Sequence, residues 1–276
     1  MTRIGSFPKL QPTYGSGISQ NVTEESIYWQ QFDKVKQFED KGTASSISFS
    51  PTLPFDFLVV SMGRVVCYSG ASMEQSFVLN IRSDVPRCAI FRPDSRIIAI
   101  GVEDGKILIF DPNTRRVVDS FKAHNGPCNH LAYTYDLHYL ISTGEDGTLR
   151  VFDPESHEQV ACTTAHADYI RDLQLTPFSP DLVATASYDR KVLVWKISSL
   201  MKDYQEAKQQ KQKQAAESNE AVSKPSPLSS TQIESASAPL YTFTHSNPVE
   251  SIVFYPGGSH IAAASLFSLI LSFIIL

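Results

Sequence analysis

The sequence is poor in cysteine, and the spacing of its four cysteines excludes the usual cysteine-based sites. They stand at positions 67, 88, 128 and 162, so the intervals of 21, 40 and 34 residues match neither a zinc-binding nor a redox pair. We therefore expect four free and mostly buried thiols, as is common for proteins of a reducing compartment.

The sequence also lacks the short motifs of the common enzyme classes. It has no GxSxG nucleophile elbow, no GxGxxG or Walker loop and no HExxH metal pair. The segment HNGPCNH brings His124, Cys128 and His130 close together, but we expect His124 in a turn and the other two beside a strand. We predict no catalytic residue, no cofactor and no metal, so that the protein is not an enzyme.

Two further absences concern charge and targeting. The net charge is −5, which excludes a globally basic surface for nucleic acid but leaves a local basic patch open. The first ten residues, MTRIGSFPKL, contain no apolar stretch of the kind that a secretory signal needs. Hydrophobic residues make up 42% and charged residues 19%, as in a globular protein with a sizeable core.

What the sequence does have is an internal repeat with a period of 42 to 43 residues. Short apolar strands that close on an aromatic residue recur at Tyr68, Phe110, Phe152 and Trp195. An acidic turn precedes three of them at the same period, at Asp104, Asp146 and Asp189. An upstream histidine marks the last two, at His124 and His166. Three markers with one period indicate a repeat architecture.

Each repeat contains about four short strands separated by turn residues, as the alternation in CAIFRPDSRIIAIGVEDGKILIF illustrates. Four strands in such a period are typical of WD40 repeats, and the units resemble that family. The resemblance implies an all-β fold: an incomplete WD40 β-propeller of four and a half blades, preceded by an N-terminal arm.

In the WD40 family, a histidine, a strand Ser or Thr, the turn Asp and a Trp form a buried hydrogen-bonded chain. The resemblance implies such a chain in the fourth unit, built from His166, Thr185 or Ser187, Asp189 and Trp195. The third unit has only His124, Ser142 and Asp146, because Phe152 has no N–H to donate. We therefore expect the fourth blade to be the best defined.

The repeat divides the chain into four expected parts. Residues 1–43 form the arm, which seals the propeller edge or docks a partner, and residues 44–198 form blades one to four. We place the blades at 44–75, 76–120, 121–162 and 163–198. Residues 199–239 are a low-complexity insertion, rich in Gln, Lys, Ser and Glu, between the fourth and fifth blades. Residues 240–276 form a partial fifth blade with an aberrant apolar tail.

The tail, IAAASLFSLILSFIIL, carries no charge and is shorter than a typical membrane-spanning helix. Three alternatives stay open. The chain is truncated inside the fifth blade and ends in an unrelated segment, which the loss of period at Ser265 favours; or a buried strand pair completes the blade irregularly; or the tail is a membrane anchor. We expect no membrane partner.

Several phrases resemble a more specific WD40 family, the U3 small nucleolar RNA-associated scaffold proteins of the nucleolar small-subunit processome. They are Pro12-Thr13-Tyr14, Tyr28-Trp29, Phe49-Ser50-Pro51 and Pro180-Asp181-Leu182 ahead of Tyr188-Asp189. The resemblance covers about residues 8–198. It implies a nucleolar, non-catalytic scaffold that supports pre-ribosomal RNA processing and small-subunit assembly.

The partners implied are other WD40 proteins of the processome and the pre-ribosomal RNA particle, with direct RNA contact left open. As binding anchors we favour aromatic and arginine side chains, namely Tyr28, Trp29, Arg82 and Arg171. The alternative is a generic WD40 adaptor, such as a substrate receptor of a ubiquitin ligase, which would be cytoplasmic.

Overall fold

A computed structural model describes residues 42–81, 84–176, 179, 181–202, 238–255, 260–265 and 268–274. Nearly all of the expected arm and residues 203–237 of the insertion lie outside these ranges. Three of the predicted partner-binding residues, Tyr28, Trp29 and Arg82, also lie outside the described residues.

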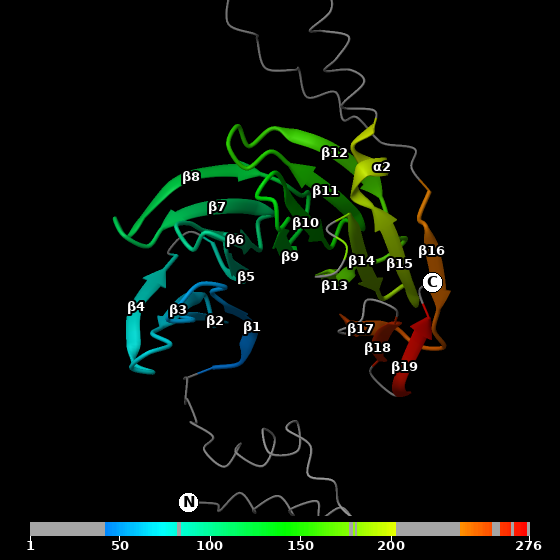
Figure 1. Ribbon diagram of the computed structural model, residues 1–276, viewed down its shortest axis with the longest axis horizontal. Helices are drawn as coiled ribbons and strands as arrows, with labels where there is room; N and C mark the ends of the chain where they lie inside the picture. Colours follow the sequence, from blue (N-terminus) through cyan, green and yellow to red (C-terminus); the bar gives the residue numbers. More distant parts are fainter. Residues whose placement is uncertain are drawn as a thin grey trace, which may run out of the picture. The chain divides into compact units, whose positions relative to one another are not determined.

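The first three sheets each contain four antiparallel strands in chain order (Figure 1). The first sheet comprises β1 (Ala44–Phe49), β2 (Phe57–Ser61), β3 (Arg64–Tyr68) and β4 (Gln75–Asn80). The second comprises β5 (Pro86–Phe91), β6 (Ile98–Val102), β7 (Lys106–Asp111) and β8 (Arg116–Lys122). The third comprises β9 (Cys128–Tyr133), β10 (Leu140–Gly144), β11 (Thr148–Phe152) and β12 (Gln159–Thr164).

The sheets end later than the expected blade limits. The outer strands β4 and β8 reach Asn80 and Lys122, whereas the sequence placed the blade ends at 75 and 120. The reason is that the closing aromatic, such as Phe110, marks the third strand of a sheet and a fourth strand follows it.

The fourth sheet holds the insertion. It comprises β13 (Ile170–Leu175), β14 (Leu182–Ser187), β15 (Lys191–Lys196) and β16 (Tyr241–Thr244). β16 pairs with β15, Lys191 lying opposite Thr244 and Val194 opposite Tyr241. The sequence analysis assigned β16 to the fifth blade; the structure places it in the fourth, so the insertion lies inside that blade and not between two blades.

The fifth sheet has three described strands, β17 (Val249–Phe254), β18 (His260–Ser265) and β19 (Ser268–Ile274). The apolar tail contributes β19, which pairs antiparallel with β18, His260 lying opposite Ile274. Of the three alternatives for the tail, this pairing corresponds to the strand pair. In the described ranges, no helix has the length and hydrophobicity to cross a membrane.

The hydrophobic core lies between neighbouring sheets. All residues of β6 and β10 are buried, because both faces of each sheet are covered, whereas the outer strand β8 is almost wholly exposed. The first strands of successive sheets lie side by side: β1 beside β5, β5 beside β9, β9 beside β13 and β13 beside β17 (Figure 1). This packing of radial sheets confirms the predicted all-β propeller fold.

One short helix, α2 (Ile197–Leu200), follows β15 and contacts the outer strand β12 of the third sheet. Ile197, Leu200 and Met201 are buried in one cluster with Val160 of β12 and Trp195. The helix therefore covers the outer edge of the third sheet. The corresponding edge of the second sheet, strand β8, is exposed.

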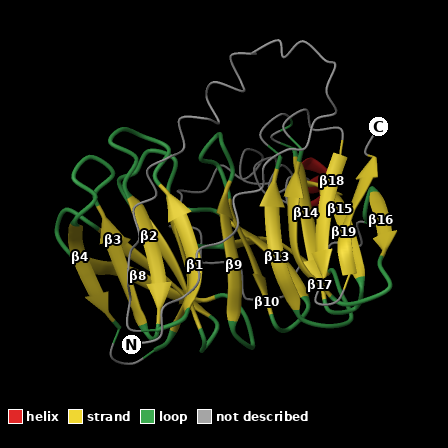
Figure 2. Ribbon diagram, turned by 90° about the horizontal axis from the view of Figure 1, so that it is seen from below, coloured by secondary structure: helices red, strands yellow, loops and turns green. Residues whose placement is uncertain are grey.

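The connecting loops gather at the two ends of the strands (Figure 2). Because the sheets are antiparallel, the loops after the first and third strands of a sheet lie at one end and the remaining loops at the other. We call the end that carries loops 50–56, 69–74, 92–97 and 112–115 the first rim. The end that carries the turns around Asp104, Asp146 and Asp189 is the second rim.

Candidate functional site

The fourth sheet contains a buried chain of hydrogen bonds beneath the second rim. His166 follows β12, and its Nδ1 lies 3.0 Å from Asp189 Oδ2 in the β14–β15 turn. Its Nε2 lies 2.8 Å from Thr185 Oγ1 on β14. The indole Nε1–H of Trp195 donates to the same hydroxyl oxygen at 3.3 Å. One threonine thus joins the histidine and the tryptophan inside the sheet.

Ser187, the alternative that the sequence left open beside Thr185, has a different position. Its hydroxyl donates to the carbonyl oxygen of Asp168 at 3.1 Å and accepts the backbone N–H of Asp189 at 3.1 Å. Ser187 therefore holds the turn that presents Asp189, whereas the ring of His166 bonds to Thr185.

The third sheet repeats the first part of this chain. His124 Nδ1 lies 3.0 Å from Asp146 Oδ1, and its Nε2 lies 2.8 Å from Ser142 Oγ on β10. Phe152 occupies the tryptophan position and is buried. The three residues that the sequence grouped here are therefore brought together, and the fourth member is replaced by an apolar ring.

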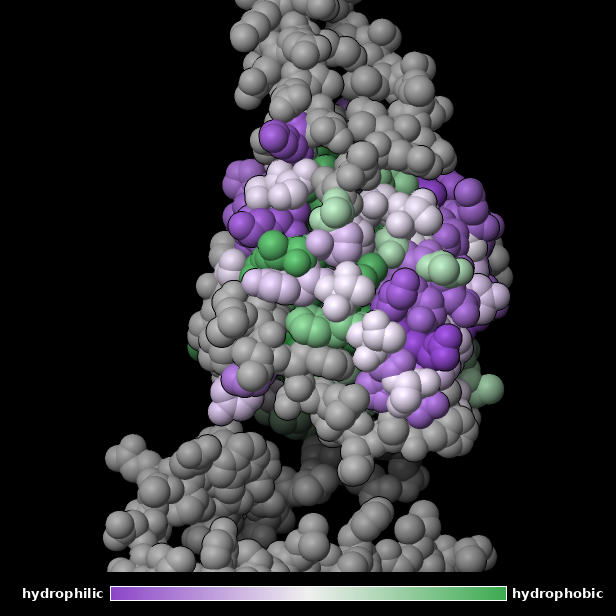
Figure 3. Space-filling model, turned by 90° about the vertical axis from the view of Figure 1, so that its right-hand side faces the viewer, coloured by the Kyte–Doolittle hydropathy of each residue, from purple (hydrophilic) through white to green (hydrophobic). Residues whose placement is uncertain are grey.

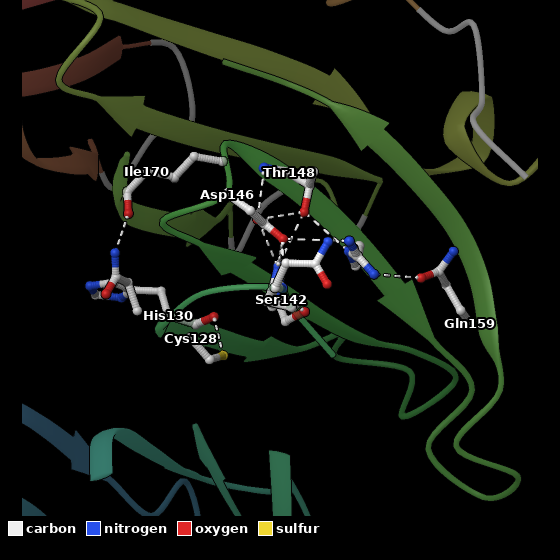
Figure 4. A network of polar contacts seen from close by, with 11 residues as sticks. Cys128, His130, Ser142, Asp146, Thr148, Gln159 and Ile170 are labelled. Atoms are coloured by element: carbon white, nitrogen blue, oxygen red, sulfur yellow. Dashed lines mark hydrogen bonds and ion pairs between the residues drawn. The ribbon is translucent and has the colours of Figure 1, made fainter. Parts of the chain in front are cut away.

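The network of the third sheet continues through residues that the sequence analysis missed (Figure 4). The hydroxyl of Thr148 donates to Asp146 Oδ1 at 2.7 Å. Arg150, which is 9% exposed, places Nη2 3.4 Å from Asp146 Oδ2 and donates from Nη1 to Gln159 Oε1 at 3.2 Å. A signal was present: Arg150 interrupts GTLRVF at a position where the neighbouring repeats have leucine.

The electrostatics fit a neutral histidine beside a charged carboxylate. Burial lowers the pKa of His124 and of His166 and outweighs the opposing effect of Asp146 and Asp189. Burial also disfavours the charged form of Asp146, but hydrogen bonds from His124 and Thr148 hold its pKa well below the usual range. Nδ1–H then donates to the carboxylate, while Nε2 accepts from the hydroxyl.

The fifth sheet has the histidine without its partners. His245 is buried, and its Nδ1 accepts the backbone N–H of Asn247 at 3.2 Å. Its Nε2 has no hydrogen-bond partner in the described part of the chain. The strand register explains this, because Ala263 stands where the third and fourth sheets have Ser142 and Thr185.

Polar contacts tie the fourth sheet to the fifth. The buried carboxylate of Asp172 accepts from Ser251 Oγ and from the backbone N–H of Ile252, both at 2.8 Å. Arg171 Nε donates to Glu250 Oε2 at 3.2 Å, and its guanidinium lies 5.3 Å from the ring centroid of Tyr188. Arg171, a predicted partner anchor, is thus engaged between two sheets; a partner contact there stays a prediction.

The side of the molecule that carries the fourth and fifth sheets presents hydrophobic side chains between groups of hydrophilic ones (Figure 3). Two exposed apolar residues here are Val253 of β17 and Tyr255, which follows that strand. All four cysteines are buried free thiols, and the described residues include no group of His, Cys, Asp or Glu that could hold a metal ion.

Comparison with known families finds a match for three segments of the chain. The family described as WD domain, G-beta repeat matches residues 115–153, 157–196 and 237–266. The last match includes β16, β17 and β18, which agrees with a resumption of the repeat after the insertion.

Among curated proteins, the chain is similar to homologues of U3 small nucleolar RNA-associated protein 15. The Xenopus laevis homologue is 28% identical over 188 residues, which cover 68% of this chain and 36% of the relative. The protein of that name from Saccharomyces cerevisiae is 25% identical over 249 residues, which cover 89% of this chain and 42% of the relative. The chain therefore spans less than half of the length of these relatives.

Proposed function

Since the chain is a WD40-repeat protein that resembles U3 small nucleolar RNA-associated protein 15, we propose that it is a non-catalytic scaffold of the nucleolar small-subunit processome. In this role it supports pre-ribosomal RNA processing and assembly of the small ribosomal subunit. The observation that carries the proposal is the similarity to relatives named for their association with U3 small nucleolar RNA, in vertebrates and in yeast.

The geometry supports a binding role. Rigid sheets present short loops at two rims, and such loops are where proteins of this architecture hold partners. The conspicuous polar clusters, around His124 and His166, are buried and internally satisfied, so they stabilise the sheets and do not face a substrate.

The proposed partners are other WD40 proteins of the processome and the pre-ribosomal RNA particle, and the proposed location is the nucleolus. Tyr28, Trp29, Arg82 and Arg171 are the proposed partner contacts. Arg171 is 35% exposed at its side chain, so it can contact a partner while it holds Glu250.

Gradient sedimentation tests the proposal. The tagged full chain is expressed in cells, and the lysate is separated with and without ribonuclease. We expect the chain to sediment with a large pre-ribosomal particle and to shift to light fractions after ribonuclease treatment. Light sedimentation without treatment, together with cullin-type partners in a pull-down, would instead support a ubiquitin-ligase adaptor.

A further inference from the structure

We propose that the first rim, where the first and second sheets meet, binds one nucleotide of single-stranded RNA. The inference deepens the proposed function and rests on it for the choice of RNA as the ligand. A pocket of about 310 Å³ opens there, within the range of small-ligand sites.

The wall of the pocket contains a cluster of three hydroxyls from two sheets. Ser50 Oγ and Thr52 Oγ1 each lie 2.7 Å from Ser95 Oγ. Ser50 is buried, so this cluster is fixed in place by the fold. The three contacts among these hydroxyls can use all three O–H donors but leave acceptor lone pairs free, which suits the hydroxyls of a ribose.

A cation stands beside these hydroxyls. Arg115 lines the pocket, is exposed, and forms no ion pair among the described residues. Its backbone φ is +56°, in a turn that Asp111 fixes by accepting from the N–H of Asn113 and the hydroxyl of Thr114. A guanidinium on a fixed turn, with no carboxylate partner among the described residues, is well suited to bind a phosphate.

The third sheet shows that the fold does not require arginines in the first-rim loops. The corresponding loops have the same backbone: φ is +57° at Ser95 and +63° at Leu137, and +56° at Arg115 and +58° at His157. Loops 92–97 and 111–116 carry four arginines and two aspartates, whereas loops 134–139 and 153–158 carry four acidic residues and no arginine or lysine. The turn conformation therefore does not require the arginines of the second sheet.

The remaining lining residues favour RNA over other phosphate-bearing ligands. Phe77 and Phe91 line the pocket and offer apolar ring surface to a base. Asp56 also lines it; one of its oxygens accepts the N–H of Gly70 at 2.9 Å, so the other can accept a ribose 2′-hydroxyl. A 2′-hydroxyl contact distinguishes RNA from DNA.

Fluorescence anisotropy of labelled oligonucleotides with the purified full chain tests the site. The probes are an oligouridine of about ten nucleotides, the matching deoxythymidine oligomer and a phosphoserine peptide. We expect R115E to weaken oligouridine binding about tenfold and to lower the salt dependence of binding by roughly one to two ions. T52V is expected to weaken RNA binding and to reduce the preference for RNA over DNA.

R190E is the matched control. Arg190 is an exposed arginine with a backbone φ of +69°, so the charge change and the turn conformation are alike, but it lies at the second rim. Equal loss of RNA binding in R115E and R190E, equal binding of RNA and DNA, or a preference for the phosphopeptide would overturn the inference. If R115E alone loses RNA binding but the wild-type chain fails to sediment with pre-ribosomal particles, the site stands and the proposed function fails.

Discussion

The third and fourth sheets perform the same structural task with different residues. Both place a buried histidine between a turn aspartate and a strand hydroxyl at nearly identical distances. The fourth sheet continues the chain from the Thr185 hydroxyl to the indole of Trp195 on β15, whereas the third continues it from Asp146 to the guanidinium of Arg150 on β11. In the fourth sheet Asp189 accepts a hydrogen bond from a neutral histidine. In the third sheet Asp146 does the same and also neutralises the buried guanidinium of Arg150.

The comparison teaches that the repeat conserves a geometry and not a set of residues. A hydrogen-bonded core stabilises a sheet only when every buried member has a partner. The network around His124 meets this condition without a tryptophan, so the expectation that the fourth blade would be the best defined does not follow from the missing indole alone. Among the described residues of the fifth sheet, Ala263 offers no hydroxyl and His245 Nε2 has no partner, so the condition is not met there.

The largest expected effect comes from the turn aspartates. D146A should lower the free energy of unfolding by about 3 kcal/mol, because Arg150 is left buried without its counter-charge. D189A should cost about 2 kcal/mol, since only hydrogen bonds are lost. Urea unfolding followed by circular dichroism measures both. A larger loss in D189A would contradict the proposed difference between the two sheets.

Lowering the pH should weaken both sheets. The pKa values of His124 and His166 lie below the ordinary value of 6.5 in the folded protein because the rings are buried. The unfolded chain therefore binds more protons as the pH falls through 6.5, so the stability is full above that pH and is lost below it. Between pH 7.5 and 5.5 we therefore expect both histidines to lower the free energy of unfolding.

Unfolding at several pH values measures this loss. In H166Q the free energy of unfolding should fall less between pH 7.5 and 5.5 than it does in the wild-type chain, whatever the stability of the variant at pH 7.5. An unchanged pH dependence in that variant would show that His166 is not the titrating group.

Exchanging the aromatic residues sharpens the comparison further. W195F gives the fourth sheet the ring of the third, and it should cost about 1.5 kcal/mol because the N–H bond to Thr185 and some packing volume are lost. The reverse change, F152W, should also cost about 1 to 3 kcal/mol, since the larger ring meets a filled site. A stabilising F152W would show that the third sheet is incomplete without a tryptophan.

The smallest expected effect is a gain. A263S supplies a hydroxyl that can accept the Nε2–H of His245, and it should raise the stability by roughly 0.5 to 1 kcal/mol. The control is A184S, which buries a hydroxyl among apolar residues of the fourth sheet and should lower the stability by about 1 kcal/mol. Thermal unfolding of both variants tests the contrast; a loss in A263S would refute the role assigned to Ala263.

The sequence predicted the features that repeat along the chain. The period located the strands, and it located Asp146, Asp189 and both histidines, because each recurs at a fixed interval from a closing aromatic. It could not locate the partners of Arg150, because arginine in a strand is usually solvent-exposed, and only the fold shows that this side chain is buried beside Asp146 and Gln159.

Pairing across the insertion was also beyond the sequence. β16 has only four residues, and nothing local shows that it pairs back to β15 and not forward with β17. The first-rim pocket was missed for a similar reason. Ser50 and Ser95 are distant in the chain, and only the packing of the first sheet against the second brings their hydroxyls together.

The most direct test of the central claim is the RNA that accompanies the chain in cells. The tagged full chain is purified under native conditions, and U3 small nucleolar RNA is quantified against an abundant spliceosomal RNA. A scaffold of the small-subunit processome should enrich U3 RNA strongly, together with pre-ribosomal RNA. Recovery of U3 RNA at the level of the spliceosomal control would contradict the claim.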